Sequence, residues 1–347
     1  MKTDGAPKVP YKIKIRNVGR TVEADDDDNV MSAAILAGID YPSGCQSGNC
    51  GSCKSELLSG SVKMSNYSRI ALKREERTQG LILACRAVPK SDCDIAWLEP
   101  DEYVEHPRNE HDCRVAAIEA PTHDVRIVRL DIGDGGALAF SAGQFATLRF
   151  GDLPGRDYSM ANPPSTEQLE FHIRALPDGL VSEHVAQRLR VGDAVRVVGP
   201  SGTAHLRQKH CRPIVAIAGS TGLAPLLSII QTAIEANMPQ PIQLYFGVRQ
   251  ERDLYAMDRL TALAKCHAPL TVIPVISEPK TNCPYRTGLV TDAVAEDHAN
   301  LDGAKAYIAG PPAMVEAALD ILQARRMRGQ DCHADAFFTE AEKAALP

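Results

Sequence analysis

The chain has 347 residues, which is enough for two or three domains of ordinary size. Its composition, 44% hydrophobic and 24% charged, is that of a globular protein. The formal net charge of −6 gives no sign of the basic surface that nucleic-acid binding needs, and no apolar run is as long as a membrane span. Residues 1–7 also lack the apolar core of a signal peptide, so we expect a cytoplasmic protein that binds neither nucleic acid nor membrane.

A cysteine-rich stretch lies near residue 50. Cys45, Cys50 and Cys53 are spaced C-x4-C-x2-C, and Cys85 follows later in the chain. This spacing is typical of the ligands of a plant-type [2Fe–2S] cluster. Glycines between the cysteines allow the backbone to curl around the cluster and let amide N–H groups approach the sulfurs. We therefore predict that these four cysteines hold the cluster.

A disulfide pair or a zinc site is the alternative for these cysteines. Zinc ribbons use two C-x2-C pairs, however, and this chain has one such pair. The other cysteines are scattered singly and are predicted to be ordinary thiols; they are Cys93, Cys113, Cys211, Cys266, Cys283 and Cys332.

Residues 1–100 surround this stretch with short strands and one helix. The pattern predicts strands at 11–15, 21–23, 54–58 and 81–84 and a helix at 29–37. Together with the cysteine core, this segment resembles a plant-type ferredoxin domain, which implies an α+β (β-grasp) fold with Cys45, Cys50, Cys53 and Cys85 as iron ligands. Residues 101–112 are polar and read as a linker, in which His106 and His111 are expected to be exposed rather than metal ligands.

Residues 113–209 show short strands separated by Gly, Pro and Asp turns, which predict an antiparallel β-barrel. The expected strands are 115–118, 126–130, 145–150, 169–174 and 194–198, and one helix is expected at 180–189. Within this region Arg156, Tyr158 and Ser159 form an R-x-Y-S motif. An arginine can neutralise a phosphate and a tyrosine can lie flat against a ring system. An edge strand with ordinary polar residues is the alternative interpretation of this short motif.

Two further motifs of this region contain polar residues that could bind a cofactor. His172 and Arg174 place polar side chains on one strand face, and Gly179 with Ser182 forms a glycine turn that opens a helix. A helix N-terminus with a hydroxyl beside it is suited to phosphate binding.

In this order, the motifs resemble the FAD-binding domain of the ferredoxin–NADP⁺ reductase superfamily. The resemblance implies that Arg156 contacts the flavin pyrophosphate, that Tyr158 stacks on the isoalloxazine, and that Ser159 reaches its N5 edge. It also implies that Arg174 and Ser182 hold the ribityl and phosphate parts. We include His172 and Gly179 among the predicted cofactor-binding residues.

From residue 210 to 347 apolar strands alternate with helices, which predicts a doubly wound parallel sheet. Strands are expected at 213–218, 242–247, 270–276 and 304–309, and helices at 226–236, 254–264 and 313–325. Ligands bind such sheets beyond the carboxyl ends of the strands. The predicted nucleotide-binding residues at those ends are Gly219, Thr221, Gly222, Gly247, Arg249, Gly310 and Pro311.

This last region resembles the NAD(P)-binding domain of the same superfamily. The first glycine turn departs from the family pattern by Ser220 in place of a glycine, and Ala309 stands where the family has a cysteine. The resemblance implies that Phe337 is the C-terminal aromatic that covers the flavin, although a last apolar strand is the alternative. On this basis Ser159 and Phe337 are the predicted catalytic positions.

The choice between NADH and NADPH depends on the charges near the end of the second parallel strand. Arg249 and Arg252 could bind a 2′-phosphate, whereas Glu251 and Asp253 would repel it, which favours NADH.

The domain order resembles the reductase component of bacterial multicomponent aromatic-ring oxygenases, of the naphthalene dioxygenase reductase type. That implies electron transfer from NADH through FAD and the [2Fe–2S] cluster to a Rieske-type ferredoxin or the terminal oxygenase. We expect a monomer. Two alternatives stay open: a reductase for a di-iron monooxygenase or a deoxysugar-forming iron–sulfur enzyme, and an electron-transfer subunit that does not use NADH.

Overall fold

The structure of the protein is a computed structural model, and it describes residues 10–99, 102, 104, 106–133 and 136–345. These residues form two compact units. The first comprises the described residues up to Glu99 and those from Phe338 to Ala345, and the second runs from Glu102 to Phe337. Within the described residues, no helix has the length and apolar character needed to cross a membrane.

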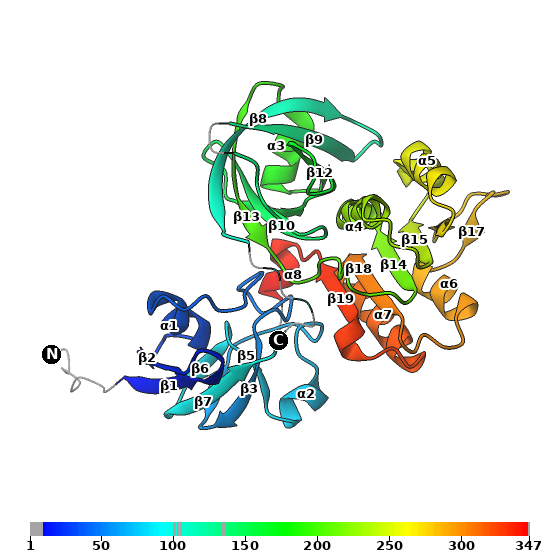
Figure 1. The fold of residues 1–347 in the computed structure, drawn as a ribbon. Helices are drawn as coiled ribbons and strands as arrows, with labels where there is room; N and C mark the ends of the chain where they lie inside the picture. Colours follow the sequence, from blue (N-terminus) through cyan, green and yellow to red (C-terminus); the bar gives the residue numbers. More distant parts are fainter. Residues whose placement is uncertain (1–9, 100–101, 103, 105, 134–135, 346–347) are drawn as a thin grey trace. The chain divides into compact units, whose positions relative to one another are not determined.

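The first unit is a mixed five-stranded sheet with the order β2-β1-β7-β3-β5 (Figure 1). Its strands are β1 (Tyr11–Ile15), β2 (Arg20–Ala24), β3 (Lys54–Ser59), β5 (Leu81–Leu83) and β7 (Cys93–Trp97). A second, two-stranded sheet consists of β4 (Val62–Met64) and β6 (Ala87–Pro89). The helices are α1 (Val30–Leu36), α2 (Arg74–Thr78) and α8 (Glu340–Ala344).

Local sequence explains these elements. In β1 the side chains of Ile13 and Ile15 are fully buried while Lys12 and Lys14 are exposed, as the period of two requires. The side chain of Asn29 caps α1 by accepting a hydrogen bond from the N–H of Ser32 (2.8 Å). The predicted ferredoxin-like α+β fold is confirmed.

The second unit begins with a six-stranded antiparallel sheet in the order β11-β10-β13-β8-β9-β12 (Figure 1). Its strands are β8 (Asn109–Glu119), β9 (Val125–Ile132), β10 (Phe145–Phe150), β11 (Arg156–Ser159), β12 (Gln168–Arg174) and β13 (Ala194–Ser201), with helix α3 (Leu180–Gln187). A bridge between Met160, just after β11, and Phe171, in the middle of β12, joins the two edge strands, so the sheet curls into a near-barrel.

The start of β8 differs from the sequence expectation. The strand begins at Asn109, inside the stretch that reads as a linker. His111 pairs with Val197 across the sheet and is buried, so its expected exposure was wrong. The reason is the period of two in β8, where His111, Cys113 and Val115 share the inward face. His106 is half-buried and contacts Ser141.

The rest of the second unit is a six-stranded parallel sheet, ordered β17-β16-β15-β14-β18-β19. Its strands are β14 (Ile214–Gly219), β15 (Ile242–Val248), β16 (Leu270–Ile276), β17 (Arg286–Thr287), β18 (Lys305–Gly310) and β19 (Cys332–Ala336). The helices are α4 (Leu223–Glu235), α5 (Met257–Cys266), α6 (Val290–Asp297) and α7 (Pro312–Ala324). Every residue of β14 and β18 is buried, as expected for central strands covered on both faces.

Helices α4 and α6 of the parallel-sheet half depart from the prediction, and the short helices α2 and α8 of the first unit were not predicted either. α4 starts at Leu223, before Pro225, because a proline in the first turn of a helix removes an N–H that has no intrahelical partner. α6 was not predicted; it is short, and its polar Thr291, Asp292 and Glu296 obscure the apolar period.

Candidate functional site

The cysteine loop of the first unit is tightly curled. Gln46, Gly48 and Gly51 have positive φ angles of 52°, 79° and 76°. A side chain on Gly48 would lie 2.9 Å from the Cγ atom of Arg86, and one on Gly51 would lie 3.0 Å from the carbonyl oxygen of Ala71. Glycine is therefore needed at both positions for the loop to close, both for its backbone conformation and for lack of space.

Backbone N–H groups of the loop point at the sulfurs of the predicted ligands. The N–H groups of Asn49 and Ser47 lie 3.2 and 3.5 Å from the Sγ atom of Cys45. The N–H of Cys45 lies 3.3 Å from Sγ of Cys50. Such donors stabilise negative charge on sulfur, as metal-bound thiolates require.

The four predicted ligands fall into two pairs. Sγ of Cys53 lies 3.3 Å from Sγ of Cys85. A hydrogen bond with Cys50 lowers the pKa of the Cys45 thiol to about 5, and one with Cys85 lowers the pKa of Cys53. Among the described residues, no group of three or more His, Cys, Asp or Glu side chains is arranged to hold one metal ion. Two cysteine pairs suit a cluster of two irons, each with two thiolate ligands.

The R-x-Y-S motif forms β11, an edge strand that pairs only with β10 in the sheet. Burial raises the pKa of the Tyr158 hydroxyl. Ser159 is buried, and its hydroxyl donates a hydrogen bond to Oδ2 of Asp335 (3.0 Å), which lies in β19 of the parallel sheet. The arrangement brings the motif's serine to the last parallel strand. Tyr158, the preceding residue of β11, points to the other face and packs half-buried against the barrel core.

The glycine turn before α3 is held by its serine. The hydroxyl of Ser182 accepts a hydrogen bond from the N–H of Leu176 (3.1 Å) and donates one to the carbonyl of Gly179 (3.1 Å). A side chain on Gly179 would lie 2.4 Å from that hydroxyl. The turn presents the first N–H groups of α3, which suit a phosphate.

A cavity of about 320 Å³ lies at the carboxyl ends of the parallel strands. Its walls contain four of the predicted nucleotide-binding residues, namely Gly219, Gly247, Arg249 and Pro311. Arg174, which was predicted to hold part of the flavin, lines the same cavity from β12, together with Asp124 and Val125. The cavity is therefore built jointly by the barrel and the parallel sheet.

The remaining predicted glycines lie behind the cavity walls. A side chain on Gly222 would lie 2.0 Å from the carbonyl oxygen of Ala309, and one on Gly310 would lie 2.9 Å from the carbonyl oxygen of Gly219. These glycines let the ends of β14 and β18 approach each other. Thr221 belongs to the same single turn, Ser220–Gly222, between β14 and α4.

The backbone conformation at Ser220 explains why the family pattern has a glycine at this position. Its φ angle is +53°, in the left-handed region that glycine adopts at little cost. A glycine at this position would therefore satisfy the backbone without strain, and serine accepts it at an energetic cost.

Phe337 follows β19 and packs, half-buried, against the core of the parallel sheet. Its N–H donates a hydrogen bond to the carbonyl of Gly310 (2.9 Å), which fixes it beside the third glycine turn. Residues Cys332–Ala336 thus form the last strand of the parallel sheet, and the aromatic comes directly after it.

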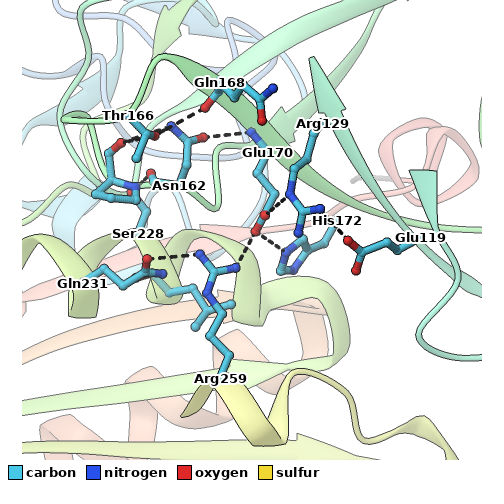
Figure 2. A network of polar contacts seen from close by, with 12 residues as sticks. Glu119, Arg129, Asn162, Thr166, Gln168, Glu170, His172, Ser228, Gln231 and Arg259 are labelled. Atoms are coloured by element: carbon cyan, nitrogen blue, oxygen red, sulfur yellow. Dashed lines mark hydrogen bonds and ion pairs between the residues drawn. The ribbon is translucent and has the colours of Figure 1, made fainter. Parts of the chain in front are cut away.

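His172 occupies a different place from Arg174, although both lie on β12. Its side chain is fully buried, with Nδ1 2.9 Å from the hydroxyl of Tyr255. Its Nε2 lies 3.2 Å from Oε1 of Glu170 (Figure 2). Burial lowers the pKa of His172. Burial also acts to raise the pKa of Glu170, but contacts with His172 and Arg259 outweigh it and hold that pKa well below its usual range.

The charges around the cavity are mixed. Arg174 donates a hydrogen bond to Asp124 (Nε to Oδ2, 2.7 Å), and contacts that include this one lower the pKa of Asp124 against the effect of burial. A polar extension of the cavity is lined by His123, Arg174, Arg249, Gln250, Arg252, Asp253 and Glu278. Two acidic side chains, Asp253 and Glu278, therefore line this extension. The carboxylate of Glu251 instead accepts a hydrogen bond from the N–H of Lys280 (3.3 Å).

Three protein-family models match successive parts of the chain. Residues 13–90 match the model of a 2Fe-2S iron-sulfur cluster binding domain. Residues 112–206 match an oxidoreductase FAD-binding domain, and residues 216–320 match an oxidoreductase NAD-binding domain.

The chain has relatives that it matches over most of their length. The chain is 41% identical, over 89% of its length and 93% of the relative's, to the ferredoxin–NAD(P)⁺ reductase component of the naphthalene 1,2-dioxygenase system of Pseudomonas putida. The chain belongs to this family of oxygenase reductase components. The reductase is also 34% identical to the reductase component of propane 2-monooxygenase from Gordonia, over 95% of this chain and 98% of that one.

A solved structure shares the fold of the reductase. A cytochrome P450 reductase from Amycolatopsis superposes with a TM-score of 0.75 at 34% identity, covering 94% of this chain and 98% of the other. The reductase is thus an oxidoreductase with [2Fe–2S], FAD and NAD modules, as the sequence predicted.

Two acidic residues of the site were not found from the sequence. Asp335 contacts Ser159, 176 positions earlier, and Asp124 contacts Arg174, 50 positions later. Asp335 lies two residues before Phe337, and that adjacency was the only available signal. Pairings over such distances are set by the packing of the barrel on the sheet, which no local pattern reveals.

Proposed function

We propose that the reductase binds NADH in the cavity between β12 and the parallel strand ends, and that electrons leave through the cluster to a partner protein. The observation that carries this proposal is the joint cavity, which Arg174 lines from the barrel and Gly219, Gly247 and Pro311 line from the sheet. A nicotinamide bound there would lie between the NAD-binding strands and the end of β12 that carries Arg174.

We assign FAD to Arg156, Tyr158 and the N-terminus of α3, and the cluster to the two cysteine pairs. FAD held by these residues would supply a hydride acceptor for NADH that can release its two electrons singly. Ser159 and Phe337 are the proposed residues beside the reacting ring. The Ser159 hydroxyl donates its hydrogen bond to Asp335. The lone pairs of the Ser159 oxygen therefore remain available to accept a hydrogen bond.

NADH is proposed as the preferred nucleotide. Asp253 and Glu278 line the polar extension of the cavity, and their charges oppose a 2′-phosphate there. Arg252 is close to Asp253 (Nε to Oδ1, 3.8 Å), which offsets part of its positive charge.

The proposed acceptor is a Rieske-type ferredoxin or the terminal oxygenase of an aromatic-ring-hydroxylating system, and the proposed setting is a monomer in the cytoplasm. The likeness to the naphthalene dioxygenase component supports this acceptor. The likeness to the propane 2-monooxygenase component supports a second candidate, a monooxygenase partner. Electron transfer to each purified acceptor, with NADH as donor, distinguishes the two, and sedimentation tests the monomer.

The test of the electron path is anaerobic reduction by NADH and, separately, by NADPH. We expect NADH to bleach the flavin absorbance rapidly and to produce the EPR signal of a reduced [2Fe–2S] cluster, and NADPH to do so far more slowly. Reduction by dithionite but by neither nucleotide would make this chain a carrier that does not use NAD(P)H.

A further inference from the structure

Strand β12 has two faces with different neighbours. The side chains of Leu169, Phe171 and Ile173 point into the barrel core. The alternate side chains, Glu170, His172 and Arg174, therefore point away from that core. All but Arg174 are buried, so this second face is covered by another part of the molecule.

The cover is the NAD-binding half. On the neighbouring strand β9, Val125 pairs with Arg174 and Ile127 pairs with His172. Both Val125 and Ile127 belong to the hydrophobic core of the parallel sheet rather than to that of the barrel. The shared face of β9 and β12 is thus the boundary between the two halves of the second unit.

Glu170 is the centre of a polar network at this boundary (Figure 2). From the barrel, Arg129 on β9 donates to Oε2 (2.9 Å). From the NAD-binding half, Arg259 on α5 donates to Oε1 (2.6 Å). The side chain of Glu170 is only 7% exposed, so both contacts are made away from bulk water.

Further hydrogen bonds connect the network to α4. Arg259 donates to the side-chain oxygen of Gln231 (3.0 Å). Asn162 accepts from the N–H of Glu170 through Oδ1 (2.9 Å) and from the hydroxyl of Ser228 through its carbonyl oxygen (2.7 Å). Glu170 is therefore held from both α4 and α5, which belong to the NAD-binding half (Figure 2).

The other end of the same strand face is the nucleotide cavity. Arg174, four residues along β12, lines that cavity opposite Gly219 and Pro311. Because a strand is stiff over four residues, an offset of β12 against α5 at Glu170 changes the distance across the cavity at Arg174.

We propose that Glu170 is a positioning residue that sets the alignment of the flavin-binding barrel against the NAD-binding sheet, and with it the geometry of hydride transfer. The proposal rests on the proposed function. Val125 and Ile127 supply apolar contact, which is not directional and permits sliding. The charge-assisted hydrogen bonds to Glu170 come from opposite sides and fix direction and distance. Removing one partner from such a buried group leaves uncompensated charge and loosens the alignment.

The test compares Glu170→Gln with Glu119→Gln in the full-length reductase loaded with FAD and cluster. Glu119 is the exposed second partner of Arg129, so both variants lose one carboxylate contact with the same arginine, but only the first breaks the link to α5. Anaerobic stopped-flow mixing with a series of NADH concentrations separates nucleotide affinity from the limiting rate of flavin bleaching. We expect Glu170→Gln to lower the limiting rate roughly 10- to 100-fold, as misplacement of about 1 Å does, and Glu119→Gln to leave it unchanged.

Hydrogen–deuterium exchange provides a readout that is independent of activity. Peptides covering β12 and α5 should exchange faster in Glu170→Gln than in Glu119→Gln, while β10 and β13 should be unchanged. Dithionite should reduce flavin and cluster normally in both variants.

Arg259 provides a second route if Glu170→Gln does not fold, because Arg259 is one-third exposed and lies on α5. Arg259→Gln should slow bleaching as Glu170→Gln does, Arg259→Lys should restore part of the rate, and the double variant should be no slower than the slower single one. The proposal is overturned if NADH bleaches the wild-type flavin rapidly and Glu170→Gln or Arg259→Gln bleaches at the same limiting rate. A wild-type flavin that NADH does not bleach would contradict the proposed function instead.

Discussion

The cluster site and the nucleotide cavity differ in how far apart their residues lie in the sequence. Cys45, Cys50 and Cys53 share one loop, and Cys85 follows β5, which pairs with the strand that leaves the loop. The cavity instead combines Arg174 with Gly219, Gly247 and Pro311. Ser159 of the R-x-Y-S motif likewise contacts Asp335 at a separation of 176 residues. A local site depends on the conformation of one segment, whereas the cavity depends on how two sheets pack.

The largest expected effect concerns the local site. Replacing Cys50 by serine should abolish the visible absorbance and EPR signal of the cluster and electron output to any protein acceptor, because serine does not supply a thiolate ligand. Flavin bleaching by NADH should continue, since the cavity is built from other residues. The control is Cys93→Ser, at a buried cysteine of β7 outside the predicted ligand set. An intact cluster signal in Cys50→Ser would refute the ligand assignment.

The second prediction addresses the packed site through Gly222. A Cβ atom there would lie 2.0 Å from the carbonyl oxygen of Ala309, so Gly222→Ala must push the ends of β14 and β18 apart. We expect a loss of about 1–3 kcal/mol in the free energy of unfolding and weaker NADH binding, with the cluster signal unchanged. Urea unfolding and NADH titration measure the two effects.

Gly329→Ala is the matched control for Gly222→Ala. Apart from its chain neighbours, no described residue places an atom within 4 Å of a Cβ added at Gly329, so the same substitution should be nearly neutral. Equal stability of the two variants would show that the close approach of β14 and β18 is not required.

The third prediction uses the pH dependence of the boundary between barrel and sheet. The pKa of His172 is lowered in the folded protein, chiefly by burial among Glu170, Tyr255, Arg129 and Arg259. The unfolded chain therefore binds a proton at His172 before the folded chain does, and stability should fall as the pH drops below about 6.5. The pKa of Glu170 is also lowered in the folded protein. The free energy of unfolding should therefore fall further below about pH 4.3, where the unfolded chain begins to bind a proton at this carboxylate.

Urea unfolding followed by flavin release at pH 7.5 and pH 5.5 tests this sign. The midpoint should be lower at pH 5.5, and the difference should shrink in His172→Gln. His106 and His298 also have pKa values lowered by burial, so part of the pH dependence should remain in that variant. A midpoint that rises at pH 5.5 in the wild-type protein would contradict the prediction.

The smallest expected effect is at Ser220. Its φ angle of +53° costs a non-glycine residue about 1–2 kcal/mol, and glycine would remove this strain. The greater flexibility of glycine in the unfolded chain would offset about 0.5–1 kcal/mol of the stability gained. Ser220→Gly should therefore raise the free energy of unfolding by about 0.5–1 kcal/mol, measured by urea unfolding. A decrease would mean that the serine side chain stabilises the turn by a contact that outweighs the strain.

The amino-acid sequence by itself determined the parts that depend on short-range patterns. The cysteine spacing, the period of two in β1, and the alternation of buried strands with helices indicated the three modules and the fold class. It also indicated the glycine turns at Gly219, Gly247 and Gly310, because a turn is a property of a few adjacent residues. Patterns of this kind are local, so they can be read without knowing how distant segments meet.

Only the tertiary structure decided which residues meet across the boundary of barrel and sheet. It brought Arg174 to the nucleotide cavity, turned His172 toward Tyr255 and Glu170, and paired Ser159 with Asp335. It also turned His111 into the barrel. The physical reason is that the same polar residue on a strand is satisfied by solvent, cofactor or a second sheet according to what packs against its face, and that packing involves segments far apart in the chain.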